Sequence, residues 1–289
     1  MKYLVKSFLI IFSILFFTNT LISQNSIINL SKLQEQDTTS YLVIGFGSMG
    51  DYTSSKDSFV IILRNFKQVE KYDKITYLGL HNIPVDTFIS IASYLKDVTR
   101  ISWHDKKITQ LPDEFFTLKN IKIICFFFPE MNDFPDKLYL LSKLRELCIN
   151  KTKIKIVPES IGSLKNLRYL DLTKNQINYI SASIGKLKKL KSIDLSHNNL
   201  KSLPNSFTSL KNLRIINLEG NILEELPEPF INLKKIQILN ICKNNLTNLP
   251  QNFNKIPNDN IRIEWFNNPW NEKDLALLKT YKPYSFLHQ

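Results

Sequence analysis

The chain has 289 residues, of which 43% are hydrophobic, and it contains 7 glycines and 12 prolines. This composition supports a substantial buried core and excludes collagen-like and low-complexity chains. The formal net charge of +12 favours acidic partners or polyanions without identifying any one of them.

Residues 1–23 have the three-part layout of a secretory signal peptide. Lys2 and Lys6 precede an apolar stretch from Phe8 to Phe17, and a smaller, more polar segment then ends at Ser23. The apolar stretch is about half of the ~20 residues that span a bilayer, so cleavage is favoured over a permanent anchor. We therefore expect an exported protein that does not span the membrane after cleavage.

Residues 24–74 are predicted to form a linker and a strand-and-helix cap. The segment from Tyr41 to Ile44 has a strand pattern. Helical spacing follows at Phe59, Ile62, Leu63, Phe66 and Val69. This cap is expected to cover the first end of the core.

Between the expected strand and helix, Gly45, Gly47 and Gly50 have the spacing of a dinucleotide-binding turn. Two features argue against that interpretation. The helix begins about six residues too late for its amides to meet a pyrophosphate, and the next strand ends without an acid to hold the ribose. A flexible turn is preferred, and no dinucleotide is expected.

From residue 75 the same apolar pattern restarts every 23 positions, without an insertion. The unit from Leu190 to Asn212 has apolar side chains at unit positions 1, 4, 6, 11, 14, 18 and 21. Positions 4 and 6 alternate as in a strand, whereas positions 14, 18 and 21 are spaced like a helical turn. Stacked units of this kind bury a continuous apolar ladder and make their strands parallel. The eight units, which occupy residues 75–258, start at Ile75, Val98, Ile121, Leu144, Leu167, Leu190, Leu213 and Ile236.

Unit position 9 is asparagine in the last four units, at Asn175, Asn198, Asn221 and Asn244. An amide at this point, where the strand ends, can satisfy turn backbone groups that stacking buries. The first four units have Ile83, Lys106, Pro129 and Thr152 there instead. We expect irregular bends in those units.

The pattern LxxLxLxxNxLxxLPxxIxxLxx resembles the leucine-rich repeat family, in the 23-residue form of exported bacterial proteins. The resemblance implies an α/β right-handed solenoid, with a parallel sheet on its concave face and short helical or irregular returns on its convex face. It also implies a protein or peptide ligand, no cofactor and no catalysis, and we expect a monomer. Proline marks position 15 in six units, at Pro112, Pro135, Pro158, Pro204, Pro227 and Pro250.

Residues 259–289 are predicted to cap the second end. The phase of the repeat slips after Pro257, and Ile261 and Ile263 begin a last strand. A helix is expected from Glu272 to Lys279, with Asn271 as its N-cap.

The concave face is the main candidate for binding, because interfaces concentrate affinity in aromatic and arginine anchors. Side chains at positions 3, 5 and 7 project from it, about 4.8 Å from their equivalents in the next unit. The first five units are rich in anchors there, although an irregular unit could tuck Phe127 or Phe128 inside. The predicted ligand-binding residues are Tyr77, His81, Arg100, His104, Phe127, Phe128, Glu146 and Tyr169.

A cluster of His81, His104, Cys125 and Cys148 on the same face has three alternative interpretations. Zinc would need three or four ligands that converge tetrahedrally, which parallel side chains on a sheet seldom provide. The two cysteines could instead form a disulfide, although side chains that point the same way strain it. A cysteine nucleophile would need an orienting group and an oxyanion pocket, of which the sequence gives no sign. We expect no metal and no catalytic residue.

Lysine or arginine recurs at positions 22, 23 and 2, just before each strand. Such a ridge could bind an acidic polymer or a cell-surface glycan, but repeats also copy a solvated lysine readily. Polyanion binding is therefore the second hypothesis, and steep weakening by salt would distinguish it. The ridge consists of Lys119, Lys122, Lys143, Arg145, Lys165, Arg168, Lys188, Lys189, Lys191, Lys211, Arg214, Lys234 and Lys235.

Overall fold

The computed structural model describes residues 41–45, 60–63, 75–256 and 261–281, and for the first two of these ranges it describes the backbone. All of them belong to one unit of the chain, which begins at Tyr41. Within these residues, no helix has both the length and the apolar character that crossing a bilayer requires.

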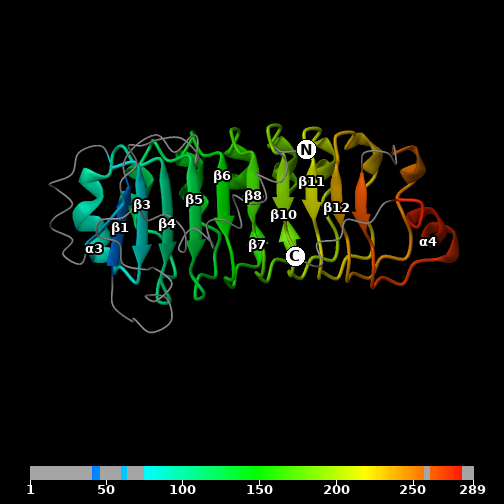
Figure 1. Ribbon diagram of the computed structural model, residues 1–289, viewed down its shortest axis with the longest axis horizontal. Helices are drawn as coiled ribbons and strands as arrows, with labels where there is room; N and C mark the ends of the chain where they lie inside the picture. Colours follow the sequence, from blue (N-terminus) through cyan, green and yellow to red (C-terminus); the bar gives the residue numbers. More distant parts are fainter. Residues whose placement is uncertain (1–40, 46–59, 64–74, 257–260, 282–289) are drawn as a thin grey trace, which may run out of the picture. The chain divides into compact units, whose positions relative to one another are not determined.

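Nine parallel strands form most of an 11-stranded sheet and follow one another in chain order (Figure 1). Equivalent residues pair from strand to strand, so that Leu78, Ile101 and Ile124 lie in one row. The predicted parallel sheet of consecutive repeats is confirmed. The strands are β3 (Tyr77–His81), β4 (Arg100–His104), β5 (Ile123–Phe127), β6 (Glu146–Ile149), β8 (Tyr169–Asp171), β10 (Ser192–Asp194), β11 (Ile215–Asn217), β12 (Ile238–Asn240) and β13 (Arg262–Glu264).

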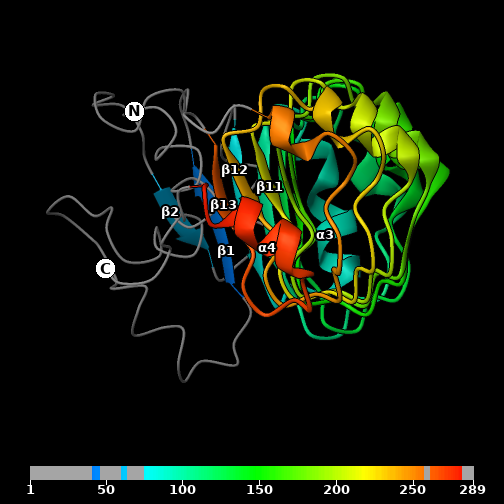
Figure 2. The same ribbon diagram turned by 90° about the vertical axis from the view of Figure 1, so that its right-hand side faces the viewer.

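Short helices return the chain on the side opposite the sheet (Figure 2). The first return contains α3 (Val85–Ile91) and η2 (Ala92–Tyr94), and the later returns are 3₁₀ turns. The proline at unit position 15 stands directly before four of these turns. Before η6 the residue at this position is Ser181, whose Oγ accepts from the Ser183 N–H at 3.1 Å. The 3₁₀ turns are η3 (Asp113–Thr117), η4 (Asp136–Leu140), η5 (Glu159–Ser163), η6 (Ala182–Lys186), η7 (Asn205–Ser209), η8 (Phe230–Asn232) and η9 (Phe253–Lys255). Two short strands, β7 (Ile156–Val157) and β9 (Tyr179–Ile180), pair in parallel between returns.

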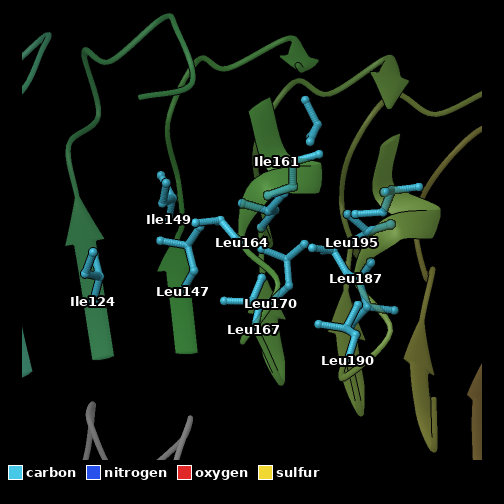
Figure 3. Close-up of a cluster of buried hydrophobic side chains, with 14 of the residues drawn as sticks. Ile124, Leu147, Ile149, Ile161, Leu164, Leu167, Leu170, Leu187, Leu190 and Leu195 are labelled. Atoms are coloured by element: carbon cyan, nitrogen blue, oxygen red, sulfur yellow. The ribbon is translucent and has the colours of Figure 1, made fainter. Parts of the chain in front are cut away.

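Leucine and isoleucine side chains from the strands and returns fill the space between them. Figure 3 shows Leu147 and Leu170 on neighbouring strands, with Leu164 and Leu187 from the returns. All four are at most 2% exposed. Full burial of one such side chain contributes about 1.5–3 kcal/mol, and each unit depends on its neighbour for it.

The early units add a cluster of contacting aromatic rings to this aliphatic core. Trp103 lies 4.7 Å from Phe88 and 5.7 Å from Phe128, measured between ring centroids. Phe126 stacks on Phe128 at 4.9 Å. These large rings occupy the units that lack asparagine at position 9.

The asparagine ladder is confirmed, and each amide makes three hydrogen bonds that link its own unit to the preceding one. The Asn198 Nδ2 donates to the carbonyls of Leu172 and Leu195, both at 2.9 Å, and its Oδ1 accepts from the Ile177 N–H at 2.9 Å. Asn175, Asn221 and Asn244 repeat the pattern. Asn268 adds one more rung in the C-terminal cap, donating to the Ile241 and Trp265 carbonyls.

The bends of the early units do differ, as expected. Thr152 stands in for asparagine, since its Oγ1 donates to Asn175 Oδ1 at 2.5 Å and accepts from the Ile154 N–H at 3.2 Å. At position 8 the chain takes a left-handed turn in most units, as at Lys174 with φ 56°, but among the described units Asp105 and Phe128 do not. In these two units the inward and outward alternation continues to position 8, where Asp105 and Phe128 are buried.

The N-terminal cap differs from the prediction. The strand expected near Tyr41 is present as β1 (Tyr41–Gly45), but residues 60–63 form a second strand, β2 (Val60–Leu63), which pairs antiparallel with β1. The predicted helix over this segment is wrong, because the run Val60-Ile61-Ile62 is β-branched and favours extended backbone. Phe59, Phe66 and Val69 lie outside the described residues.

The antiparallel pairing also bears on the glycine motif that begins at Gly45. Strand β1 pairs antiparallel with both β2 and β3. A dinucleotide-binding turn requires a parallel strand-helix-strand crossover, which this arrangement does not provide. Gly47 and Gly50 lie outside the described residues.

At the other end, β13 and α4 (Glu272–Leu278) form the predicted strand and helix of the C-terminal cap. The Asn271 side chain accepts from the Asp274 N–H at 2.9 Å and caps the helix as expected. Leu239 of β12 pairs with Ile263 of β13, which is 24 residues later in the chain. The one residue more than the 23 of a unit is the predicted slip in phase.

Replacing Asn198 with alanine should lower the free energy of unfolding by about 3–5 kcal/mol, because it leaves buried carbonyls and an N–H without partners. Urea unfolding followed by circular dichroism measures the change. Asn199 is the matched control, since its side chain is exposed and its replacement by alanine should cost at most about 0.5 kcal/mol. Equal losses in the two variants would contradict the role of the ladder.

Candidate functional site

The open face is the face of the sheet opposite the core, formed by unit positions 3, 5 and 7. In β4, the partly buried Arg100, Ser102 and His104 alternate with the fully buried Ile101 and Trp103. The same alternation runs through β5. Seven of the predicted binding residues lie on this face and are partly buried: Tyr77, His81, Arg100, His104, Phe127, Glu146 and Tyr169.

Phe128 is a correction. Its side chain is 0% exposed and packs on Phe126 and Trp103, so the prediction that it lines the face is wrong. Because unit 3 lacks the left-handed turn at position 8, Phe128 continues the inward alternation of β5.

Three rings form a continuous row across the first three units. The centroids of His81 and His104 are 6.4 Å apart and those of His104 and Phe127 are 5.4 Å apart, with interplanar angles of 29° and 28°. The Lys151 Nζ lies 5.0 Å from the Phe127 centroid and ends the row with a cation. We call these four residues the ring row.

The environment of the ring row keeps His104 neutral. Burial lowers the pKa of His104 to about 4, and the nearby charges of His81 and Lys151 act in the same direction. At neutral pH, His104 therefore presents an uncharged ring beside Phe127. The row can accept an apolar or aromatic side chain without having to desolvate an imidazolium.

Charged side chains at position 3 flank the ring row. Burial raises the pKa of the Glu146 carboxyl, while Arg100, Arg145 and Arg168 lower it. Tyr169 pairs with Glu146 on the neighbouring strand. The early face therefore combines rings with both signs of charge.

Cys125 and Cys148 lie side by side in register on the open face, and both are free thiols. Cys148 Sγ lies 3.8 Å from Asp171 Oδ2, and the Asn150 Nδ2 donates to both groups, at 3.2 Å and 3.0 Å. A hydrogen bond with Cys125 and burial raise the pKa of Cys148 well above its usual value. The thiol therefore stays protonated and is a poor nucleophile.

A metal site at this cluster lacks ligands. In the ranges that the structure describes, no group of three or more His, Cys, Asp and Glu side chains converges as an ion would require. The zinc alternative needs such a group. His81 and His104 instead belong to the ring row.

The later units use position 5 for a purpose that the sequence analysis missed. Asp171, Asp194, Asn217 and Asn240 each accept a hydrogen bond from the backbone N–H two residues later, at 2.9–3.2 Å. These Asx turns end the strands. The available signal was the Asp or Asn that recurs at position 5, which is the last residue of each of these strands.

Side-chain hydrogen bonds also link neighbouring units in this later part of the face. Asn217 donates to Asp194 at 2.9 Å, Asn240 to Glu219 at 3.1 Å and Lys243 to Glu219 at 2.7 Å. Burial and the neighbouring Asp171 raise the pKa of Asp194. Polar groups there are thus engaged within the protein, whereas the early units present the ring row.

Comparisons with known proteins agree with this architecture. A family model described as a leucine-rich repeat region matches residues 152–221. The chain is similar to a solved LRR protein of Leptospira interrogans, with 30% identity and a TM-score of 0.63, over 71% of this chain and 52% of that one. It thus spans about half the length of that protein.

A second solved structure, the leucine-rich repeat domain of the type III effector XopL, shares the fold. Its identity is 20% and its TM-score is 0.57, over 70% of this chain and 80% of that domain. A comparison with curated proteins finds no match.

We expect His104 to titrate near pH 4 in the folded protein. Because the pKa is lowered on folding, the unfolded state binds the proton first as pH falls below about 6.5, so acidification towards pH 4 removes up to about 3 kcal/mol of stability. Histidine NMR resonances are readily followed, since the chain has 4 histidines. Replacing His81 with Gln should raise the midpoint, and replacing His197 with Gln should leave it unchanged. A wild-type midpoint near 6.5 would refute the assignment.

Proposed function

Because the chain is a leucine-rich repeat protein, we propose that it is an exported interaction module that binds a protein or peptide on its open face. The fold supports a role in protein interaction generally, since leucine-rich repeat domains are typically interaction modules without catalytic activity. The open face and the first five units are the more specific part of the proposal.

The ring row is the observation that carries this proposal. Aromatic and arginine side chains dominate binding hot spots, and the open face carries the ring row together with Arg100, which precedes His104 by four residues on β4. The ring centroids follow one another at 6.4 Å and 5.4 Å from strand to strand, so an extended ligand that crosses the strands meets one ring after another. A neutral His104 leaves the centre of this surface uncharged.

The flanking charges suggest the ligand chemistry. An apolar or aromatic side chain of the ligand would pack on His104 and Phe127. Acidic groups would pair with Lys151, which ends the ring row, or with Arg100 at position 3 of β4. Such pairs add specificity and orientation more than affinity.

We further propose that the chain is not an enzyme. The Cys148 thiol on the open face is held protonated because its pKa is raised, and burial raises the pKa of Cys242 to about 11. Neither group is poised as a nucleophile at neutral pH. No cofactor is required for the proposed binding.

Export is proposed from the signal-like residues 1–23, which lie outside the described residues. Amino-terminal sequencing of protein recovered from outside the cytoplasm should find a chain that begins near Gln24. Recovery of full-length protein in the cytoplasm alone would overturn this part of the proposal.

The binding proposal can be tested with a peptide selected from a displayed library on the immobilised full chain. Replacing both Arg100 and Phe127 with alanine should weaken the selected peptide by at least about 30-fold, as for a hot spot worth 2 kcal/mol. Isothermal titration calorimetry measures the dissociation constant.

A matched control is available on the last strand, where Arg262 and Phe266 occupy the equivalent positions. Replacing both of these with alanine should change the affinity by less than about threefold. Stronger weakening in the control than in the Arg100 and Phe127 variant would place the ligand on the wrong end of the face and contradict the proposal.

A further inference from the structure

The edge of the sheet where the parallel strands begin carries a concentrated positive charge. We define the basic rim as the 13 lysines and arginines at positions 22, 23 and 2 between units 2 and 8, from Lys119 to Lys235. The connecting segments at these positions contain no aspartate or glutamate. Eleven of the 13 residues are exposed, and Lys122 and Lys191 are partly buried.

The acidic side chains of the repeats lie elsewhere. Ion pairs in the described part of the chain join Lys137 to Asp113, Lys153 to Glu130, Lys201 to Glu224 and Lys243 to Glu219, and none of them includes a residue of the basic rim. Within these ranges no ion pair neutralises a residue of the rim, although Arg145 and Arg168 lie near enough to Glu146 to lower the pKa of its carboxyl.

A second ladder of hydrogen bonds holds alternate lysines of the rim in place. Unit position 23 alternates between asparagine and lysine from Asn120 to Lys235. Lys143, Lys189 and Lys235 donate to the side-chain oxygens of Asn120, Asn166 and Asn212, each at 2.7 Å. The three asparagines in turn donate to backbone carbonyls of the preceding units, at 2.8–2.9 Å. Three ammonium groups thus recur every second strand, about 9.6 Å apart.

The charge density of the rim suits a linear polyelectrolyte. Six junctions between units span roughly 24 Å at the strand spacing of about 4.8 Å. Thirteen charges over that length give about one per 2 Å, close to the one charge per ~1.7 Å of duplex DNA. A polyanion of comparable density can neutralise the whole row and release its counterions.

We propose that the basic rim binds a linear acidic polysaccharide, whose carboxylate or sulfate groups pair with successive units. The segments of the rim contain no aromatic side chain on which a base could stack, and single-stranded nucleic acids depend on such stacking. A duplex turns its phosphates away from a straight edge, whereas an extended polysaccharide keeps its acidic groups along it. Backbone-anchored ammonium groups at a fixed repeat match a polymer with a repeating unit.

The test uses the full chain and heparin, with binding measured by fluorescence anisotropy at several salt concentrations. Replacing Lys143, Lys189 and Lys235 with Gln should weaken heparin binding at least tenfold at 0.1 M NaCl. It should also lower the slope of log affinity against log salt by about 2, since each lost contact removes about 0.7–0.9.

The matched control removes three exposed lysines away from the rim, Lys106, Lys155 and Lys273, by replacing each with Gln. The net charge changes equally, so the control should weaken binding less than threefold. Equal weakening in both variants would show attraction by net charge alone and overturn the proposal. Binding of the selected peptide should be unchanged in the rim variant, which separates this surface from the open face.

Two further measurements remove dependence on the variants. Acylation of wild-type lysines, mapped by mass spectrometry, should show heparin protecting Lys188, Lys189, Lys234 and Lys235 more than Lys273; uniform protection would overturn the proposal. Competition with polygalacturonate tests whether carboxylates suffice or sulfates are needed. Tighter binding of oligothymidylate than of either polysaccharide would assign the rim to nucleic acid instead.

Discussion

The stacking of one unit on the next is the constraint from which the rest of the structure follows. Leu147, Leu170 and their equivalents are buried only because a neighbouring repeat covers them. Each asparagine of the ladder binds backbone groups of its own unit and of the one before it, as Asn198 does with Leu172 and Leu195. Both interactions require the same register in every unit. The C-terminal cap keeps this register across a step of 24 residues, since Leu239 pairs with Ile263 and Asn268 adds a rung to the ladder. Positions that face away from the stack are released from this requirement and can carry binding chemistry.

The sequence predicts best what repeats. The register of the strands, the roles of Asn175 to Asn244 and the Asn271 cap all rest on residues whose function is set within a short segment or copied between units. Predictions failed where two patterns fit one segment. Residues 60–63 satisfied helical spacing, yet their β-branched run forms a strand. Phe128 was misplaced because the direction of its side chain depends on whether the chain turns left-handed at position 8, and in unit 3 it does not.

The candidate site was only partly predictable for a related reason. The sequence placed His81, His104 and Phe127 at equivalent positions, and register then brings them together. The lowered pKa of His104 arises from burial and from the charges of His81 and Lys151, which no single unit contains. The Asx turns of Asp171 and Asp194 likewise depend on where each strand ends. The two parts of the open face thus have different roles: the early units expose rings, and the later units use their polar groups to fix the bend.

The antiparallel hairpin at the first end has a consequence for self-association. A parallel stack of repeats offers a template at each end, on which another copy could add in the same direction and grow into a fibre. Here β1 runs against β3, and β2 runs against β1, so that among the described strands β2 is the outermost and points the same way as the repeats. Strand β1 pairs with all five residues of β3 and so takes up the hydrogen-bonding edge of the first repeat. The last strand of another copy therefore cannot add directly to that repeat, and the stack of repeats ends in a hairpin instead.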